Sequence, residues 1–405
     1  MIEIINKKDC CGCHACSNVC PKQCITMKAD DEGFLYPIVD KETCIDCLLC
    51  EKVCPVINQS EPRKPLHVYA AKNKNEEIRM QSSSGGIFTL LAENVINKGG
   101  VVFGAKFDNN WNVIHDYTET IEGLAAFRGS KYVQSTIGNT YSHAKKFLQV
   151  GREVLFSGTP CQIAGLKKFL RKEYDNLLTV DIICHGVPSP KVWSIYLNET
   201  YSKLLATRLD RNKSVDSAIH GTSKSCIETI SFRSKISGWK KYSFMLKLNF
   251  PNCYEKNTGI FAETLDKNTY MRAFLCNLVL RNSCYYCPSK SGKSHSDISL
   301  GDFWSIRDFA SNFDDNKGTS LVLVNTKKGC KAYNSLVDDR KETTYTQGLK
   351  GNPCIEHCVT IPEEREDFWK EFQTGDMNIA NKIYKKKKAT ITKRILNRIK
   401  KYLKK

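Results

Sequence analysis

The sequence predicts two units of different class, a small cysteine-rich α+β module at the N-terminus and a larger mixed α/β domain after it. Ten of the 20 cysteines lie between Cys10 and Cys54, and residues 1–59 hold too few large apolar side chains to form a core unaided. From His67 onward, short apolar runs alternate with helical patterns. Between the two, residues 60–66 carry two prolines without periodicity, which is typical of a linker.

The larger domain begins with a predicted series of strands and one helix. Apolar residues spaced four apart predict a helix within residues 84–100, with Ser84 as its N-cap and Gly99 just past its end. Strands are expected on either side of it, at 67–71, 100–107 and 111–118.

A second series is typical of a parallel sheet. It consists of a strand at 153–156, a helix from about Pro160 to Leu170 and a strand at 177–184. We therefore divide the domain into a first part, 67–156, and a second part, 157–375, and we treat residues 376–405 as a tail.

Charge and hydropathy exclude several classes of protein. No run of the 405 residues approaches the ~18 uncharged apolar residues of a membrane span, and the N-terminus lacks the apolar core of a secretory signal. We therefore expect a cytoplasmic protein whose cysteines bind metal and do not form disulfides. Residues 376–405 hold 12 Lys or Arg and one acidic residue, so they carry +11 of the formal net charge of +18. The rest of the chain is only mildly basic, and we expect no nucleic-acid partner.

The N-terminal cysteines follow one pattern twice, C-x2-C-x2-C-x3-C-P. The first copy is Cys10, Cys13, Cys16 and Cys20, and the second is Cys44, Cys47, Cys50 and Cys54. In bacterial two-cluster ferredoxins the fourth cysteine of each run ligates the other cluster. We therefore expect two [4Fe–4S] clusters, cluster one on Cys10, Cys13, Cys16 and Cys54, and cluster two on Cys44, Cys47, Cys50 and Cys20. Two structural zinc sites are the alternative, although zinc usually spaces its cysteine pairs apart. Cys11 and Cys24 are surplus to the pattern and are expected to be small buried thiols.

Five ordered motifs in the larger domain carry a family resemblance. They are SSSGGIFTLLAENVINKGGVVFGAKF, FRGSKYVQS, LFSGTPCQIAGLKKFL, VDIICHGVPSP and LRNSCYYC…SDISLGDFW. Over roughly residues 1–330 the chain resembles the coenzyme F420 hydrogenase/dehydrogenase beta-subunit family, in the form with an N-terminal two-cluster ferredoxin module. The resemblance implies FAD, iron–sulfur clusters, and electron transfer between one-electron carriers and a two-electron carrier. The fold expected is thus a bacterial two-cluster ferredoxin-like module followed by a mixed α/β flavin-binding domain.

A third [4Fe–4S] cluster is expected on the resemblance together with the placement of four cysteines. Cys161 opens a helix and Cys184 ends the next strand, so both face one edge of a parallel sheet. Cys284 and Cys287 form a CxxC that completes four ligands. Cys276 competes with Cys161 for one position. The alternatives are a catalytic or merely buried thiol at Cys161, and core packing at Cys184.

Two loops are candidates for holding the flavin, since the G-x-G-x-x-G fingerprint is absent. The first is Ser83, Ser84, Gly85 and Gly86, at the start of a helix, and the second is Arg128, Gly129, Ser130 and Lys131. The first offers backbone N–H groups and the second offers counter-charge to a pyrophosphate. A capped helix start and a solvated loop are the alternatives. We assign no catalytic residue: a hydrogen-bonding role is expected for His185 and a turn-stabilising role for Asp302, because the flavin itself performs the hydride chemistry.

The tail has the pattern of a basic amphipathic helix. Apolar residues recur every four positions at Ile391, Ile395, Ile399 and Leu403, with Leu396 beside them. Such a helix binds an anionic membrane surface, which would place the protein peripherally at the inner face of the membrane. A partner's acidic groove and a solvated tail are the alternatives.

These features predict an iron–sulfur flavoprotein oxidoreductase. Electrons would run between an external donor, the clusters and FAD, with hydride exchange to coenzyme F420 or another small molecule. The expected partner is a redox protein or a small-molecule hydride carrier. A non-enzymatic electron-transfer subunit that docks a catalytic partner is one alternative, and a zinc- or cluster-stabilised interaction protein is another.

Overall fold

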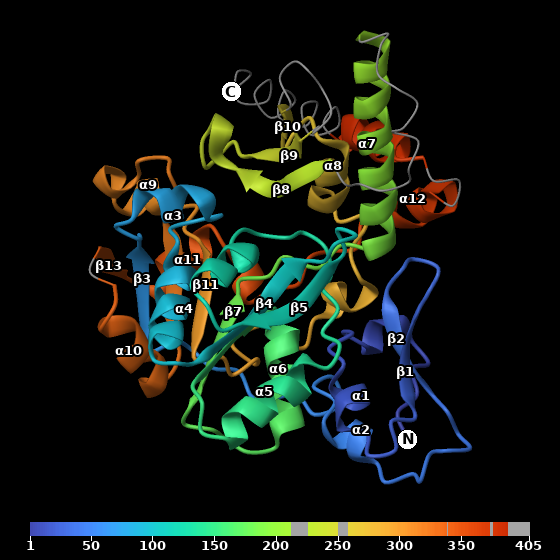
Figure 1. Ribbon diagram of the computed structural model, residues 1–405, viewed down its shortest axis with the longest axis vertical. Coiled ribbons are helices and arrows are strands. Elements are labelled where there is room, and N and C mark those ends of the chain that lie inside the picture. Colours follow the sequence, from blue (N-terminus) through green and yellow to red (C-terminus); the bar gives the residue numbers. More distant parts are fainter. Residues whose placement is uncertain (212–225, 250–257, 338, 373–375, 388–405) are drawn as a thin grey trace, which may run out of the picture.

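The computed structural model describes residues 1–211, 226–249, 258–337, 339–372 and 376–387 (Figure 1). Its N-terminal module is a small α+β unit. The module consists of α1 (Ala15–Val19), β1 (Ile25–Ala29), β2 (Leu35–Val39) and α2 (Leu49–Lys52), with β1 and β2 antiparallel. His14 and Leu48, each directly after the second cysteine of its run, adopt left-handed backbone conformations with φ of 61° and 59°. The repeated sequence pattern is thus also a repeated chain path into a short helix.

An eight-stranded mixed sheet forms the centre of the larger domain. Its order is β13-β3-β12-β11-β7-β6-β4-β5. The strands are β3 (His67–Ala71), β4 (Val101–Phe107), β5 (Val113–Thr118), β6 (Val154–Gly158), β7 (Leu177–Ile182), β11 (Ile298–Asp302), β12 (Ser320–Val324) and β13 (Arg340–Thr343). Strands β4, β6, β7 and β11 are parallel neighbours, and the other pairs are antiparallel. The predicted strand–helix–strand unit is confirmed, since β6 and β7 pair in parallel on either side of α6 (Pro160–Leu170).

Helices cover both faces of this sheet. On one face, α4 (Ile87–Asn97) and α10 (Lys327–Asn334) pack on alternate strand residues such as Val102 and Leu155. On the other, α5 (Thr140–Gln149) and α6 pack on the intervening residues, such as Phe103 and Phe156. The period-2 alternation of strand side chains thus divides the apolar residues between two cores.

The ends of α4 agree with the sequence prediction at one side only. Gly99, with φ of 73°, follows the C-cap Lys98 as expected. The N-cap is Gly86, with φ of 81°, and not Ser84. The Ser84 hydroxyl instead donates to the carbonyl of Thr319, 2.8 Å away, because the chain turns into the helix two residues later than its polar side chain suggests.

A second, smaller sheet lies above the first in Figure 1. Its antiparallel order is β10 (Thr258–Thr264), β9 (Ser243–Asn249) and β8 (Ile227–Ser234). With this sheet α7 (Pro190–Arg211), α8 (Thr269–Leu275) and α12 (Arg365–Phe372) form an aromatic core that includes Trp193, Phe232 and Tyr270. The remaining helices are α3 (Glu76–Gln81), α9 (Ile306–Phe309), α11 (Tyr345–Lys350) and one over residues 378–387. Short 3-10 turns occur at η1 (Lys7–Asp9), η2 (Glu122–Phe127), η4 (Lys235–Ser237), η5 (Asn282–Tyr286), η6 (Ser311–Phe313) and η7 (Pro353–Ile355).

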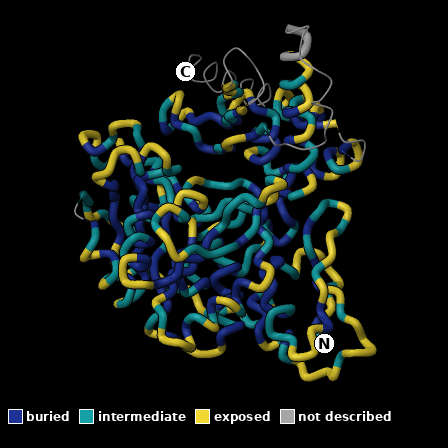
Figure 2. Tube along the Cα trace, viewed as in Figure 1, coloured by how far each residue is buried: buried dark blue, intermediate teal, exposed yellow. Residues whose placement is uncertain are grey.

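The module and the larger domain share a buried boundary. Cys11, Cys13 and Ala15 of the module belong to the same apolar cluster as Ile163 and Leu166 of α6. The exposed residues of the module lie on its outer side (Figure 2). The boundary is therefore a continuation of the core and not a loose contact.

Both segments expected to be independent of the domain pack against it. In the predicted linker, the Arg63 N–H donates to the Ser291 carbonyl at 2.9 Å and the Leu66 N–H to the Val324 carbonyl at 2.8 Å. In the predicted tail, Met377 and Ile383 are buried in the aromatic core. The stripe from Ile391 to Leu403 lies outside the described residues. Among the described helices, none has the length and apolar composition that a bilayer crossing requires.

An ion pair across the boundary gives a stability prediction. Arg365 donates to both carboxylate oxygens of Glu32, at 2.9 and 2.5 Å, and the two side chains are only 10% and 14% exposed. Arg365→Met should destabilise the folded protein by about 3 kcal/mol, because it leaves a mostly buried carboxylate unpaired. Chemical denaturation of the anaerobic protein, followed by circular dichroism, measures the change.

Two further variants check that cause. Adding Glu32→Gln to Arg365→Met should restore part of the lost stability. Lys317→Met, which breaks the exposed pair with Glu76 (42% and 64% exposed), should have a far smaller effect. Equal losses for Arg365→Met and Lys317→Met would contradict the prediction.

Candidate functional site

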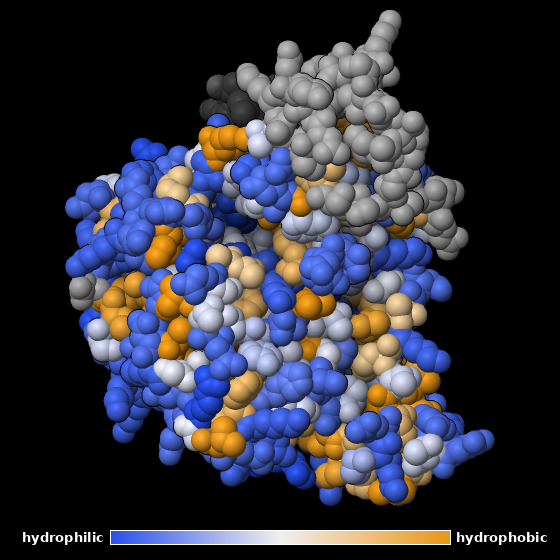
Figure 3. Space-filling model, in the orientation of Figure 1, coloured by the Kyte–Doolittle hydropathy of each residue, from blue (hydrophilic) through white to orange (hydrophobic). Residues whose placement is uncertain are grey.

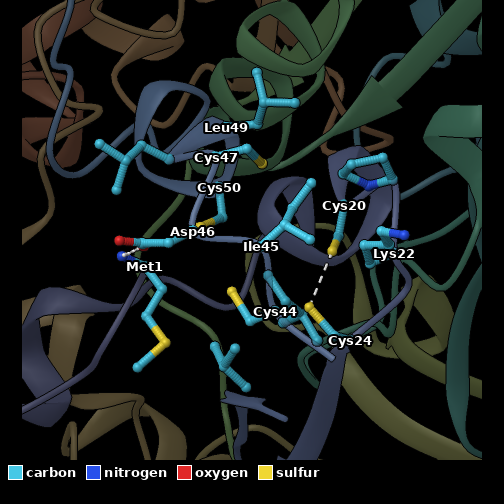
Figure 4. A pocket seen from close by; sticks show the side chains of 14 residues that line it. Met1, Cys20, Lys22, Cys24, Cys44, Ile45, Asp46, Cys47, Leu49 and Cys50 are labelled. Carbon is cyan, nitrogen blue, oxygen red and sulfur yellow. Dashed lines mark hydrogen bonds and ion pairs between the residues drawn. The ribbon is translucent and has the colours of Figure 1, made fainter. Parts of the chain in front are cut away.

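The cysteines of the module surround two separate pockets. One is lined by Cys20, Cys44, Cys47 and Cys50, whose sulfur atoms surround the space shown in Figure 4. The other is lined by Cys10, Cys13, Cys16 and Cys54. Each pocket thus takes three cysteines from one run and the fourth from the other run. In the described residues, no group of three or more His, Cys, Asp or Glu side chains is close enough to hold a single metal ion.

The two pockets differ in their surroundings. Cys47 is exposed, as are Ile45 (58%) and Leu48 (42%) beside it, so the first pocket lies at the outer surface of the module. Apolar residues are visible on this part of the surface at the lower right of Figure 3. In the second pocket, burial raises the pKa of Cys16 to about 12. We call them the outer and the inner cysteine pocket.

The two surplus cysteines are buried, as expected, and each joins a pocket. Cys24 lies 3.4 Å from Cys20, sulfur to sulfur, in the outer pocket (Figure 4). Cys11 lines the inner pocket, and its side chain interacts with those of Cys13 and Cys161. The interaction with Cys161 connects the inner pocket to the larger domain.

The structure brings Cys161, Cys184, Cys284 and Cys287 together. Cys161 lies in the first turn of α6, Cys184 follows β7, and the other two belong to the η5 segment. Burial raises the pKa of Cys184 well above its usual value. The Lys290 ammonium opposes this, and electrostatic interaction with Cys284, Cys161 and Cys287 adds to it. The Val187 N–H donates to the Cys284 sulfur at 3.4 Å.

Cys276 is not part of this group. Burial raises its pKa, and the charged side chains that act on it are those of Lys387, Glu364 and Arg272. Of the two candidates for the fourth position, the structure therefore places Cys161 beside the other three.

A cavity of about 700 Å³ opens beside these cysteines. Its wall includes Ser157 and Gly158 at the end of β6, Ile182 at the end of β7, and Cys184. It thus lies at the carboxyl ends of the parallel strands, where α/β folds place their ligands. Both predicted loops border it: Ser83, Ser84 and Gly86 of the first, and Arg128, Gly129, Ser130 and Lys131 of the second.

Gly85 is the exception, because it does not line the cavity. A Cβ at Gly85 would lie 2.3 Å from the Ala71 carbonyl oxygen and 2.7 Å from the Ser320 nitrogen. Its lack of a side chain lets the loop pack on β3 and β12, so Gly85 has a packing role where the sequence analysis expected it to hold the flavin.

The basic side chains of the second loop are held by the protein. Arg128 donates to Gln81 at 3.0 Å and to Thr89 at 3.3 Å. Lys131 donates to the carbonyls of Ala126 (2.7 Å) and Arg128 (3.0 Å), and burial lowers its pKa to about 7. These cations shape the loop and do not stand free as counter-charge. The Ser130 N–H donates to the Ser83 hydroxyl at 2.6 Å, which ties the two loops together.

One polar pair on the cavity wall was not predicted. Arg233 of β8, only 4% exposed, donates to both carboxylate oxygens of Asp302 at 2.8 and 3.1 Å. The Trp239 indole also donates to Asp302, at 2.9 Å. Asp302 was expected to stabilise a turn; its carboxylate instead fixes the small sheet against β11. Arg233 lies in a strand with no recognisable motif around it, so the sequence does not mark it as a residue of the cavity wall.

His185 also hydrogen-bonds within the wall. Its Nε2 lies 2.6 Å from Asn277 Oδ1 and its Nδ1 lies 3.6 Å from the Cys354 sulfur. His185 thus has the hydrogen-bonding role expected of it, with an amide oxygen and a thiol as its partners. Cys354, His357 and Cys358, which also border the cavity, come from a segment after α11 that the sequence reading left unassigned.

Comparisons with known proteins find matches along most of the chain. The model of the coenzyme F420 hydrogenase/dehydrogenase beta subunit N-terminus matches residues 68–140, and that of its C terminus matches residues 151–347. A 4Fe-4S dicluster domain model matches residues 9–58. No curated protein matches the sequence.

Among solved structures, the chain is similar to one from a study of xenon derivatization of the F420-reducing [NiFe] hydrogenase complex from Methanosarcina barkeri. The TM-score is 0.42 at 16% identity, and the alignment covers 78% of this chain and 95% of that one.

The grouping of the four central cysteines predicts a change in iron content. If they bind a third [4Fe–4S] cluster, Cys284→Ser should lower the iron content from about twelve to about eight atoms per chain. Cys276→Ser is the control and should leave about twelve. Iron and sulfide assays on anaerobically purified full-length chains measure both. Loss of iron in Cys276→Ser and none in Cys161→Ser would show that this ligand set is wrong.

Proposed function

Because the chain belongs to the coenzyme F420 hydrogenase/dehydrogenase beta-subunit family and carries a 4Fe-4S dicluster domain, we propose that it is an FAD-containing oxidoreductase with three [4Fe–4S] clusters. An iron–sulfur oxidoreductase is what the family itself implies. The flavin, the third cluster and the hydride exchange are our proposal.

One observation carries the flavin assignment. The two loops predicted to hold a pyrophosphate meet on the wall of one cavity. The Ser130–Ser83 hydrogen bond ties them together across 47 positions of the chain. The same wall includes Cys184, one of the four grouped cysteines. A flavin in this cavity would thus lie beside a one-electron carrier.

The chain's own residues fit such a ligand. Gly129 is exposed with φ of 79°, so its backbone lies open to a close approach. Gly86 starts an 11-residue helix whose first N–H groups favour negative charge. Phe127, Tyr132 and Phe274 supply aromatic surface on the wall. When bound, FAD accepts single electrons from the clusters and exchanges a hydride with the two-electron carrier.

The same arrangement of pockets and cavity suggests where the one-electron partner protein and the two-electron hydride carrier bind. We assign cluster two to the outer cysteine pocket, where exposed Cys47 and the apolar Ile45 and Leu48 offer a one-electron partner protein a direct approach. Coenzyme F420 or another small hydride carrier would enter the large cavity at the flavin.

Adding a negative charge to the cavity wall tests the proposed flavin site. Ser130→Asp should reduce FAD retention at least tenfold, because it places a carboxylate beside the pyrophosphate. The matched control is Ser335→Asp, at the exposed C-cap of α10 and away from the cavity wall, which should retain FAD fully. Flavin per chain after desalting, with iron per chain as the check on folding, is the measurement. A native chain without bound flavin and without hydride exchange would instead support a non-enzymatic electron-transfer subunit.

The basic tail is proposed to bind an anionic membrane surface reversibly. Because residues 376–387 pack on the domain, the truncation that tests this should end at Lys387 and leave that packing intact. The truncated chain should co-sediment less with anionic liposomes at low salt than the full chain, and salt should abolish the difference. Equal binding by the two chains would refute the proposal.

A further inference from the structure

Arg281 crosses the boundary between the larger domain and the module. It is fully buried, and its guanidinium donates to the Cys10 carbonyl at 2.8 Å and to the Leu35 carbonyl at 2.9 Å, both in the module. It also donates to Gln134 at 3.0 Å in the larger domain. The Tyr36 ring lies 4.2 Å from the guanidinium carbon.

No carboxylate is among the hydrogen-bond or ion-pair partners that the described residues provide for this cation. A buried guanidinium without a counter-charge is costly. Its Nη2 instead lies 3.5 Å from the Cys10 sulfur, in the inner pocket. Cys10 belongs to the inner pocket. Cys284, of the central group, donates its backbone N–H to the Arg281 carbonyl at 2.9 Å, so one residue contacts both groups.

The chain around this contact is built for close approach. Gly12 has φ of 67°, and a Cβ there would lie 2.8 Å from Arg281 Nη1. A Cβ at Gly165 would lie 2.9 Å from the Cys13 sulfur. Gly165 is four residues after Cys161 on α6, so one face of this helix meets Cys13 through Gly165 and Cys11 through Cys161.

We propose that electrons cross between the module and the larger domain at this contact, from cluster one to the third cluster. Arg281 is the positioning residue that holds the contact together, and it stabilises the reduced form of both clusters. The inference rests on the proposed function for the third cluster alone. Reduction adds negative charge to a cluster, so a fixed cation and an N–H···S hydrogen bond favour the reduced state. In this proposal, the two clusters balance the charge of the Arg281 guanidinium in place of a carboxylate.

The experiment is an EPR-monitored redox titration of the full-length, iron-loaded chain. Arg281→Gln should shift the reduction equilibrium of cluster one at least tenfold toward the oxidised form, which is about 59 mV for one electron. Arg281→Lys keeps the charge and should shift it less. Arg365→Gln is the matched control, because it removes the other buried arginine of the boundary, which pairs with Glu32, and it should leave the potential unchanged. Equal potentials in native and Arg281→Gln chains would overturn the electrostatic role.

A second variant tests the crossing without touching the cation. Gly165→Ala pushes α6 away from Cys13, so flavin reduction by a reduced two-[4Fe–4S] ferredoxin should slow at least tenfold in stopped-flow mixing, with cluster potentials and iron content unchanged. Native rates in a fully loaded Gly165→Ala chain would place the crossing elsewhere. If the native chain lacks the third cluster, the proposed function fails, while the effect of Arg281 on cluster one can still be measured.

Discussion

The placement of a buried guanidinium between two cysteine groups constrains much of this structure. Arg281 has no carboxylate partner among the described residues, and its fork is filled by carbonyls of the module and the amide of Gln134. Those acceptors hold it only if the module keeps one position against α6. Gly12, which lies against the guanidinium, and the shared apolar cluster serve that single placement.

The parts of the fold that were predicted correctly are those in which local pattern and tertiary contact agree. Strand β6, helix α6 and strand β7 lie where alternation and turn residues placed them, because each buries the face that its sequence marks as apolar. The N-cap of α4 was wrong, because the Ser84 hydroxyl bonds to a carbonyl 235 positions away in the chain instead of capping. The small sheet of β8, β9 and β10 was missed, since its aromatic core comes from distant helices rather than from a repeating local pattern.

The candidate site divides in the same way. Cysteine spacing within a run determines a loop around one pocket, so the eight N-terminal cysteines were grouped from the sequence alone, and the structure places them as that grouping expects. The choice between Cys161 and Cys276 depends on which side of α8 faces the sheet edge, which no short-range pattern encodes. Likewise, the sequence shows that Arg128 and Lys131 are cationic, but only the fold shows that neighbouring carbonyls and amides already occupy them.

The docked segment at residues 60–66 has a consequence for how the molecule works. A proline-bearing connection between redox units often acts as a tether, letting one unit swing between donor and acceptor. Here the Arg63 and Leu66 amides donate to carbonyls of the domain, and the two units share one apolar cluster. In the proposed function, the module would then be an electron carrier held in one position on the domain. Electron transfer between the proposed clusters would then be governed by distance and driving force. Raising the solvent viscosity, which slows a swinging unit, would leave its rate unchanged.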